Sequence, residues 1–320
     1  MDTSPIPVLI LFGPTASGKT GVLFELSEKL QIEVVSADSM QVYKGMDIGT
    51  AKPSIEERKR LTHHLIDIRE PSQQFNAGDF VRLADEVCMQ ITAGGKLPVV
   101  SGGTGFYFKN FIMGLSDAPP SDIKIREQLK QELIVKGASA LMEELAACDE
   151  VSANRIHIND EYRLLRALEV YRSCGRPLSS FEKNSQAHGG VSNSKYRFFV
   201  IGLSRPRDEL YRRINLRCEQ MFQQGLADEV RSLFEKGYTP NDPGLRAIGY
   251  REFFIEDNEN GGWKMSQDLE GVQALIAQNS RRYAKRQITF FAGLPDVKWV
   301  ECDNTEGGLA QIKRICADIF

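Results

Sequence analysis

A short segment near the amino terminus matches the phosphate-binding loop pattern G-x-x-x-x-G-K-[ST]. Its residues are Gly13, Pro14, Thr15, Ala16, Ser17, Gly18, Lys19 and Thr20. In such a loop the backbone N–H groups point at phosphate oxygens, the lysine reaches the outer phosphates and the threonine hydroxyl binds Mg²⁺. The segment therefore predicts a site for a diphosphate or triphosphate. Kinases, hydrolases and transferases share this loop, so it does not name the reaction.

A carboxylate, Asp38, follows the next short apolar run, Glu33 to Ser36. If that run is a parallel strand, Asp38 lies at its carboxyl end, where ligands bind in open α/β sheets. The side chain could take a proton from a nucleophile, hold Mg²⁺ or cap a turn. Its position alone does not choose among these roles.

A second polar turn, residues 101–107, follows the run that begins at Leu97 and reads SGGTGFY. Its glycines allow a close approach of the backbone to a ligand, and Thr104 presents a hydroxyl to the same cleft. A tight strand-to-helix turn would need the same glycines, and both interpretations can hold together. A long glycine-containing loop, residues 44–53, precedes this turn in the chain.

Short apolar runs alternate with helical patterns, which is typical of a doubly wound parallel sheet. We predict strands at Val8 to Phe12, Glu33 to Ser36, Leu97 to Ser101, Arg197 to Leu203 and Val297 to Glu301. Helical spacing covers Lys19 to Leu30, Phe80 to Ile91, Pro206 to Gln224, Leu226 to Lys236 and Val272 to Phe291. The predicted fold class is α/β, with a P-loop core in which helices flank a parallel sheet.

The pattern changes between residues 117 and 194, where helices are predicted without a convincing strand. The helices are Ile123 to Val135, Ala138 to Ala147 and Glu161 to Tyr171. The segments Ala118–Pro120 and Gln186–Ser194 have the composition of hinges. We therefore expect a discontinuous P-loop core, residues 1–116 and 195–320, and a helical insertion domain at 117–194.

The bulk composition limits the class of protein. The 320 residues are 42% hydrophobic and 26% charged, which is ordinary for a globular protein, and the net charge of −3 permits only local basic patches. A run of about 18 apolar residues is missing, and the amino terminus lacks a signal-peptide pattern. The six cysteines include no C-x-x-C pair, which favours free thiols in a reducing cytoplasm. The pair His63–His64 has no third ligand at metal spacing, so packing explains it better than a metal site.

Seven blocks, taken in order, resemble the bacterial tRNA dimethylallyltransferases, also called tRNA isopentenyltransferases. The blocks are GPTASGKT, SADSMQVYKGMDIGTAKP, HHLID, SGGTGFY, NDEYRLLRALEV, RAIGYREF and YAKRQITFF, and they cover nearly the whole chain. The P-loop alone is widespread, whereas DSMQVY followed by DIGTAKP is specific. Phe106 stands where the family usually has Leu, and Thr289–Phe291 stands where a Trp is commoner. Both positions keep a bulky apolar group.

The resemblance implies a reaction and the residues that perform it. A dimethylallyl group would pass from dimethylallyl diphosphate to N6 of the adenosine 3′ of the tRNA anticodon, giving N6-isopentenyladenosine and diphosphate. Asp38 matches the family's catalytic aspartate and would act as the base on N6. The P-loop with Lys19, and Mg²⁺ on Thr20, would stabilise the leaving diphosphate. Arg217 would also contact the diphosphate, although a solvated helix charge explains this residue equally well.

The resemblance also implies tRNA contacts in both predicted domains, because the adenosine must be flipped out of its stacked loop. The positions are Asp38, Ser39, Met40, Gln41, Thr104, Arg126, Tyr162, Arg163, Leu164, Leu165, Arg166, Arg246, Ala247, Ile248, Gly249, Tyr250 and Arg251. The residue types agree independently at one place, where Arg163 and Arg166 share a predicted helix face beside Tyr162. A second basic cluster, Arg281 to Arg286, surrounds Tyr283, and such a run is usually a solvated face.

Other functions share parts of this pattern. An isopentenyltransferase acting on free adenine nucleotides would use the same loop, but the helical insertion with Arg163 and Arg166 favours tRNA. A small-molecule kinase generally needs an arginine-rich lid, which the sequence does not show. A non-catalytic RNA-binding ATPase is a third alternative. The sequence leaves open whether ATP binds at the P-loop in competition with the allylic diphosphate, and we expect a monomer.

Overall fold

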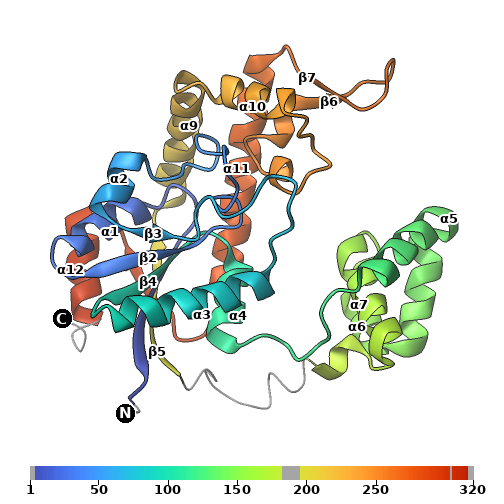
Figure 1. Cartoon of the computed structure of the whole chain (residues 1–320), viewed down its shortest axis with the longest axis horizontal. Helices are drawn as coiled ribbons and strands as arrows, with labels where there is room; N and C mark the ends of the chain where they lie inside the picture. Colours follow the sequence, from blue (N-terminus) through green and yellow to red (C-terminus); the bar gives the residue numbers. More distant parts are fainter. Residues whose placement is uncertain (1–3, 182–194, 303–304, 316–320) are drawn as a thin grey trace. The chain divides into compact units, whose positions relative to one another are not determined.

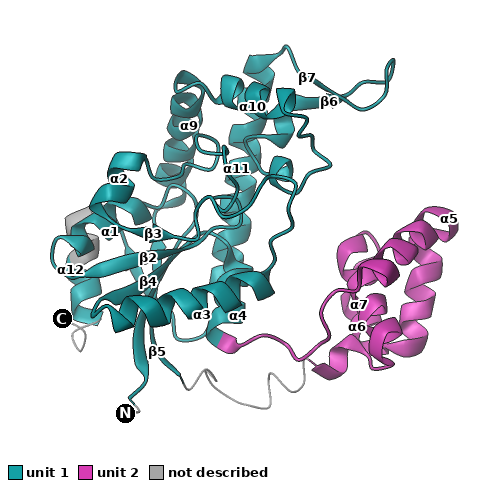
Figure 2. Ribbon diagram, in the orientation of Figure 1, with its two compact units in different colours: residues 1–112, 194–320 teal, residues 113–193 magenta. Residues whose placement is uncertain are grey.

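The computed structural model describes residues 4–181, 195–302 and 305–315. The chain divides into two compact units, unit 1 with residues 1–112 and 194–320, and unit 2 with residues 113–193 (Figure 2). Unit 2 overlaps the helical segment that we predicted at 117–194, but it begins four residues earlier and ends one residue earlier. The predicted hinge Ala118–Pro120 lies in an irregular segment. The other predicted hinge, Gln186–Ser194, lies outside the described residues.

A parallel sheet forms the centre of unit 1, with the described strands in the order β3-β2-β4-β1-β5-β8 (Figure 1). The strands are β1 Ile6–Phe12, β2 Ile32–Ala37, β3 His63–His64, β4 Leu97–Gly102, β5 Tyr196–Ser204 and β8 Lys298–Glu301. This arrangement confirms the predicted α/β core. The central strand β1 pairs with β4 and β5, so that Phe12 lies level with Gly102 and Gly202. The carboxyl ends of these three strands therefore meet at one edge of the sheet.

Alternating side chains of β1 pack on opposite faces of the sheet, as the pleat requires. Leu9 and Leu11 belong to the cluster on one face, and Val8, Ile10 and Phe12 to the cluster on the other. The first cluster includes side chains of α1 Lys19–Ser27 and α12 Thr305–Ile315, and the second those of α3 Ala77–Ala93, α4 Gly105–Met113, α9 Arg207–Gln223, α10 Leu226–Glu235 and α11 Leu269–Phe291. Burial of each such aliphatic side chain stabilises the fold by about 1.5–3 kcal/mol. The helices that carry the site are thus fixed to a rigid sheet.

Several short elements were not predicted from the sequence. They are α2 Ile55–Arg60, β3, α4, α6 Glu150–Arg155, the turns η1 Gly244–Arg246 and η2 Arg251–Phe253, the hairpin of β6 Phe254–Glu256 and β7 Trp263–Met265, and α12. All but α4 and α12 are too short to show a periodic pattern of apolar residues. The pair His63–His64 forms the edge strand β3, where His64 Nε2 lies 2.6 Å from a carboxylate oxygen of Glu33.

Unit 2 is built on α5 Ile123–Cys148, α6 and α7 Glu161–Cys174. Helix α5 is interrupted at Gly137, whose φ of 79° is left-handed, so it corresponds to the two helices predicted for this stretch. Leu129, Leu141, Leu164 and Leu168 form the centre of its core. Among the described helices of both units, none is long and apolar enough to cross a membrane.

A buried carboxylate ties the start of α5 to α7. Glu169 is fully buried and accepts hydrogen bonds from Arg126 at 3.0 Å and Arg166 at 3.1 Å. The hydroxyl of Ser121 and the N–H of Asp122 donate to it as well. Burial alone would raise the pKa of the Glu169 carboxyl, but its hydrogen bonds lower that pKa overall.

Replacing Glu169 by alanine is expected to loosen unit 2, because two arginines lose the carboxylate that they share. Removing one partner of a buried ion pair costs about 3–5 kcal/mol. Hydrogen exchange on the full-length protein should show faster exchange of the α5 and α7 amides in Glu169→Ala. Glu127→Ala, which removes the exposed i,i+3 partner of Lys130, is the control and should leave them unchanged.

The contribution of Glu169 to the stability of unit 2 should depend on pH in the wild-type protein. A carboxyl whose folded pKa lies below its unfolded pKa stabilises the fold above the unfolded value and loses this effect as the pH falls through the folded value. Protection of α5 and α7 in wild type should therefore approach that of Glu169→Ala in acid. Equal protection of the two proteins at neutral pH would show that the network does not stabilise unit 2.

Candidate active site

Loops that carry polar side chains meet at the carboxyl edge of the sheet. The P-loop follows β1, Asp38 follows β2, Thr104 follows β4 and Arg205 follows β5. Because these strands are parallel, their carboxyl ends share one edge, where ligands bind in open α/β sheets. The residues that we predicted for catalysis and diphosphate binding are therefore brought together by the topology.

The P-loop presents the start of α1 to an anion. Gly18 is the N-cap, with a φ of 106° that L side chains rarely adopt, and no side chain in the described part of the chain caps the first turn. Unpaired N–H groups and the helix dipole favour a negative group here. Lys19 Nζ donates to the backbone oxygens of Gly13 and Pro14 at 2.9 and 3.0 Å, which leaves one of its three protons for a phosphate.

The amide of Thr15 differs from the predicted arrangement. We expected the backbone N–H groups of this loop to face the phosphates, but Thr15 donates its N–H to Oε1 of Gln287 at 2.9 Å. Gln287 is a buried residue of α11, and its contact with the P-loop had no signal in the sequence. The set of amides directed at a diphosphate is smaller than predicted.

Two arginines that were not identified from the sequence hold the P-loop by its carbonyl groups. Arg213 Nε donates to the carbonyl oxygen of Ala16 and Arg205 Nε to that of Ser17, each at 2.9 Å. Arg213 precedes Arg217 by four residues on α9, so the two side chains share a helix face. This spacing was the available signal for Arg213.

Lys19 and Arg217 are two cations in a desolvated place. Burial is the main reason that the pKa of Lys19 falls to about 8, repulsion by Arg217 adds to it, and the Asp38 carboxylate opposes both. Burial also lowers the pKa of Arg217, and Asp38 again raises it. The three charged groups therefore lie close enough to interact. One carboxylate beside two cations leaves a net positive charge that suits a diphosphate.

Two hydroxyl groups of the P-loop fit a divalent cation that arrives with a phosphate. Ser17 is fully buried, and its Oγ has no hydrogen-bond partner within the described ranges. Thr20 is exposed in the first turn of α1. Mg²⁺ is bound by oxygen ligands and keeps several waters or phosphate oxygens. The donor set of the loop is consistent with the predicted Mg²⁺.

The two oxygens of Asp38 have different surroundings. Oδ1 accepts the backbone N–H groups of Met40 and Gln41 at 2.9 and 3.3 Å, which is the turn-capping role. Oδ2 receives no hydrogen bond from the residues that the structure describes. It lies 3.9 Å from the position that a Cβ would take at Gly103. The capping and base roles left open by the sequence are thus compatible, because one oxygen orients the carboxylate and the other can accept a proton.

Hydroxyl groups surround the turn that follows β4. Thr104 Oγ1 accepts the N–H of Ser39 at 2.9 Å and donates to Ser39 Oγ at 3.2 Å. Tyr283 donates its hydroxyl to the carbonyl oxygen of Gly103 at 3.3 Å. Burial and the nearby Asp38 charge raise the pKa of Tyr283 to about 12, so it is a neutral phenol. Tyr283 therefore contacts the turn at Gly103, while the guanidinium of Arg286 lies over its ring at 5.8 Å from the centroid.

The predicted tRNA segment 246–251 is divided between surface and core. Arg246 and Arg251 are exposed, and Ile248 is half-buried. Ala247 and Tyr250 are buried in the core of unit 1, so their side chains do not face a partner, and their predicted contact with tRNA stays a prediction. Gly249 is buried as well. The residues Ser39, Met40 and Gln41 of the other predicted segment are half-buried.

Glu229 of α10 joins the two loops that carry these segments. One of its oxygens accepts the N–H groups of Asp47 and Ile48 at 3.0 and 2.8 Å. The other accepts the Tyr250 hydroxyl at 2.6 Å and the N–H of Gly49 at 3.3 Å. Tyr250 is therefore a buried residue that supports the loop at residues 47–49 through Glu229.

In unit 2 the predicted tRNA segment 162–166 is divided in the same way. Tyr162 is 71% exposed, and the Arg163 side chain is 73% exposed, with an ion pair to Asp160 at 2.9 Å. Leu164 and Leu165 are buried in the core of the unit, so their side chains do not face a partner, and their predicted contact with tRNA stays a prediction. Tyr162 and Arg163 are the most exposed members of this segment, and Arg166 is partly exposed.

Arg126 and Arg166 are largely committed to unit 2 itself. Both bind Glu169, and Arg166 also donates to the carbonyl oxygen of Pro119 at 2.5 Å. The Arg126 guanidinium lies over the Tyr162 ring, 4.7 Å from its centroid. Arg163 is therefore a better candidate for a phosphate contact than Arg166.

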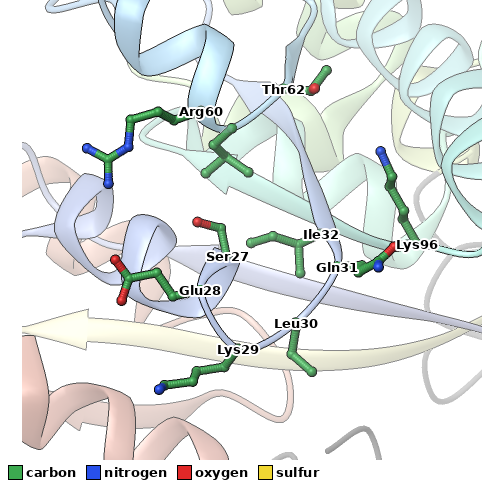
Figure 3. Close-up of a pocket in the computed structure, with 10 residues that line it drawn as sticks. Ser27, Glu28, Lys29, Leu30, Gln31, Ile32, Arg60, Thr62 and Lys96 are labelled. Carbon is green, nitrogen blue, oxygen red and sulfur yellow. The ribbon is translucent and has the colours of Figure 1, made fainter.

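A separate depression lies at the opposite edge of the sheet. It has a volume of about 420 Å³ and is lined by residues 27–32, Arg60, Leu61, Thr62 and Lys96 (Figure 3). Residues 27–31 precede β2 and Lys96 precedes β4, so the depression lies at the amino ends of these strands. It shares no residue with the predicted site and is not part of it.

A P-loop at the end of a central parallel strand, together with a carboxylate and two half-buried cations, is typical of an enzyme that acts on a phosphorylated substrate. Residues 41–293 match the family model described as IPP transferase. The chain belongs to the IPP transferase family, which confirms the resemblance found in the motifs.

Relatives and solved structures agree with this assignment. A tRNA dimethylallyltransferase of Geobacter sulfurreducens is 43% identical over 298 residues, 93% of each chain. The crystal structure of the full-length tRNA isopentenylpyrophosphate transferase from Bacillus halodurans is 35% identical, with a TM-score of 0.67, over 98% of this chain and 96% of that one. A eukaryotic dimethylallyltransferase acting on tRNA has a TM-score of 0.78 at 24% identity, over 98% of this chain and 77% of that one, and shares the fold.

The lowered pKa of Lys19 predicts that diphosphate binding depends on pH. Below about pH 8 the lysine is charged in the unbound protein, whereas above it the anion must bind together with a proton. Affinity for inorganic diphosphate should be nearly constant up to that pH and then fall by up to about tenfold per unit. Calorimetric titration in buffers of different ionisation enthalpy would measure both the affinity and the proton uptake.

Lys19→Met is the control for this titration. It should bind inorganic diphosphate more weakly and with a flat profile across the same range. A wild-type profile that is equally flat would contradict the lowered pKa, and the same slope in Lys19→Met would assign the titration to another group.

Proposed function

We propose that this chain transfers a dimethylallyl group from dimethylallyl diphosphate to N6 of the adenosine 3′ of the anticodon in tRNA. The proposal rests mainly on one observation, that Lys19, Arg217 and Oδ2 of Asp38 lie close together at the carboxyl ends of the strands. Membership of the IPP transferase family and 43% identity to a tRNA dimethylallyltransferase support it. The alternatives, a transferase for free adenine nucleotides and a small-molecule kinase, are not favoured by these relatives.

The proposed reaction forms a carbon–nitrogen bond and breaks a carbon–oxygen bond. The N6 lone pair attacks the allylic carbon, and the electron pair of the carbon–oxygen bond leaves with the diphosphate. The N6 proton passes to Asp38, and Oδ2 is the acceptor because Oδ1 is held by the turn. Thr104 is hydrogen-bonded to Ser39, the residue after Asp38, and would hold the flipped adenosine.

Positive groups meet the charge that develops on the leaving diphosphate. Lys19, Arg217 and the N–H groups at the start of α1 are fixed before the reaction and partly desolvated, which strengthens their attraction for that charge. Thr20 would hold Mg²⁺, which supplies further positive charge to the diphosphate when it is bound. No phosphoryl group is transferred, so ATP is not consumed.

The tRNA would be bound at surfaces of both units. We propose that the anticodon stem-loop is contacted by the exposed side chains of the predicted segments, namely Arg163, Tyr162, Arg246 and Arg251. Arginines suit phosphates, and an exposed tyrosine suits an unstacked base.

Asp38→Asn tests the proposed base. The amide keeps an oxygen for the turn and loses the proton acceptor, so the single-turnover rate should fall about 10²-fold or more while tRNA affinity stays within about threefold. Mass spectrometry of the tRNA nucleosides and separate assays for diphosphate and phosphate would follow the reaction. Release of phosphate by wild type would contradict the transferase proposal. A full rate in Asp38→Asn would leave Asp38 as a turn residue only.

Arg163→Ala tests the proposed RNA contact in unit 2. Each lost phosphate contact should reduce the salt dependence of tRNA binding by about one unit of slope. Filter binding across a salt series would measure this slope, and the affinity for dimethylallyl diphosphate should not change. Lys130→Ala is the matched control, since Lys130 is also an exposed cation of unit 2 in an i,i+3 pair. Equal slopes in wild type and Arg163→Ala would remove Arg163 from the RNA site.

A further inference from the structure

A buried amide connects the two halves of the candidate site. Gln287 is 5% exposed and lies on α11, outside the loops that carry the predicted residues. Its Oε1 accepts the N–H of Thr15 at 2.9 Å, and its Nε2 donates to the carbonyl oxygen of Gly103 at 2.8 Å. Thr15 belongs to the P-loop and Gly103 precedes Thr104. One side chain therefore spans the diphosphate loop and the adenosine turn.

The two contacts fix both the side chain and the backbone around it. A backbone N–H can only donate and a carbonyl can only accept, so the orientation of the Gln287 amide is determined by its partners. A Cβ at Gly103 would lie 2.6 Å from Nε2, so only glycine permits this approach. The same Cβ position is 3.9 Å from Asp38 Oδ2, which places the bridge next to the proposed base.

We propose that Gln287 is a positioning residue that sets the separation between the allylic carbon and N6. The inference rests on the proposed function. The P-loop holds the diphosphate and the turn at Gly103 holds the adenosine, so the geometry of attack depends on the distance between two loops. A misplacement of about 1 Å can cost about 10²-fold in rate. The amide of Gln287 is hydrogen-bonded to two backbone groups, so it affects the reaction through the two loops that carry these groups.

Gln287→Met keeps the approximate volume and removes both hydrogen bonds. At saturating substrates the single-turnover rate should fall about 10- to 100-fold, because the loops are no longer held together. The Kd values for inorganic diphosphate and for tRNA should stay within about threefold of wild type, because the groups that bind each substrate remain. A residue that only maintains the P-loop would instead raise the Kd for diphosphate.

Tyr283→Phe is the matched comparison. Tyr283 lies one turn earlier on α11 and also donates to the Gly103 carbonyl, but among the described residues it makes no hydrogen bond to the P-loop. Its loss should reduce the rate less than Gln287→Met does.

Gln287→Glu gives a readout that a packing role would not move. A neutral carboxyl can accept from Thr15 and donate to Gly103 as the amide does, whereas an ionised carboxylate cannot donate. The rate of Gln287→Glu relative to wild type should therefore rise as the pH falls.

Three outcomes would overturn the inference. They are an unchanged rate in Gln287→Met, a loss in that variant explained by weaker diphosphate binding alone, and a pH-independent rate ratio for Gln287→Glu. If wild type itself forms no N6-dimethylallyl product, the proposed function fails. If wild type forms the product and the variants match it, only the inference fails.

Discussion

The repulsion between two half-buried cations, Lys19 and Arg217, beside the Asp38 carboxylate is the constraint on which the rest of the candidate site depends. Burial of Lys19 and Arg217 is unfavourable, and it lowers the pKa of both. Asp38 offsets this only in part, and the carbonyl groups of Gly13 and Pro14 take two protons of Lys19. The proposed diphosphate would complete the set. The fold thus keeps a region of net positive charge, which favours an anionic ligand and would stabilise the charge that develops on a leaving diphosphate.

Such a site requires a rigid frame, because mutually repelling cations would otherwise separate. The frame is the parallel sheet, whose register brings the ends of β1, β4 and β5 to one edge. Arg205 and Arg213 then hold the P-loop by its carbonyl groups, and α11 holds it through Gln287. The P-loop is thus held by Arg205, which follows β5, by Arg213 of α9 and by Gln287 of α11, all more than 180 residues further along the chain.

This separation explains how much of the site could be predicted from the sequence. The P-loop and Asp38 were found because a local pattern and the end of a strand mark them. The long helices and the buried strands were found because their apolar residues repeat with the right period. Gln287 lies in the block YAKRQITFF, but neither this block nor the sequence around Arg205 shows a role for these residues, since their roles are defined by partners far away in the chain. Even Arg217 stayed ambiguous, because helical spacing does not show which polar face is covered.

The family motifs limit prediction in another way, because consecutive residues of one motif have different environments in the structure. At the start of α7, Tyr162 and Arg163 face solvent while Leu164 and Leu165 face the core. This alternation follows from 3.6 residues per turn, so a contiguous motif cannot be a contiguous contact surface. In this segment the exposed residues are available for the proposed tRNA contact, and the buried leucines fix the helix to the core of unit 2.

Three polar side chains share the task of holding surface segments from within. Glu169 in unit 2, Glu229 on α10 and Gln287 on α11 each lie on a helix and bind groups of other segments. A helix that is packed on a core moves little, so a loop that is hydrogen-bonded to it is held in a fixed position. The exposed residues of the family motifs would then contact the substrates. The three inner residues would fix the positions of those exposed residues. Sequence motifs that include both kinds describe a surface together with its support, and only the structure separates the two.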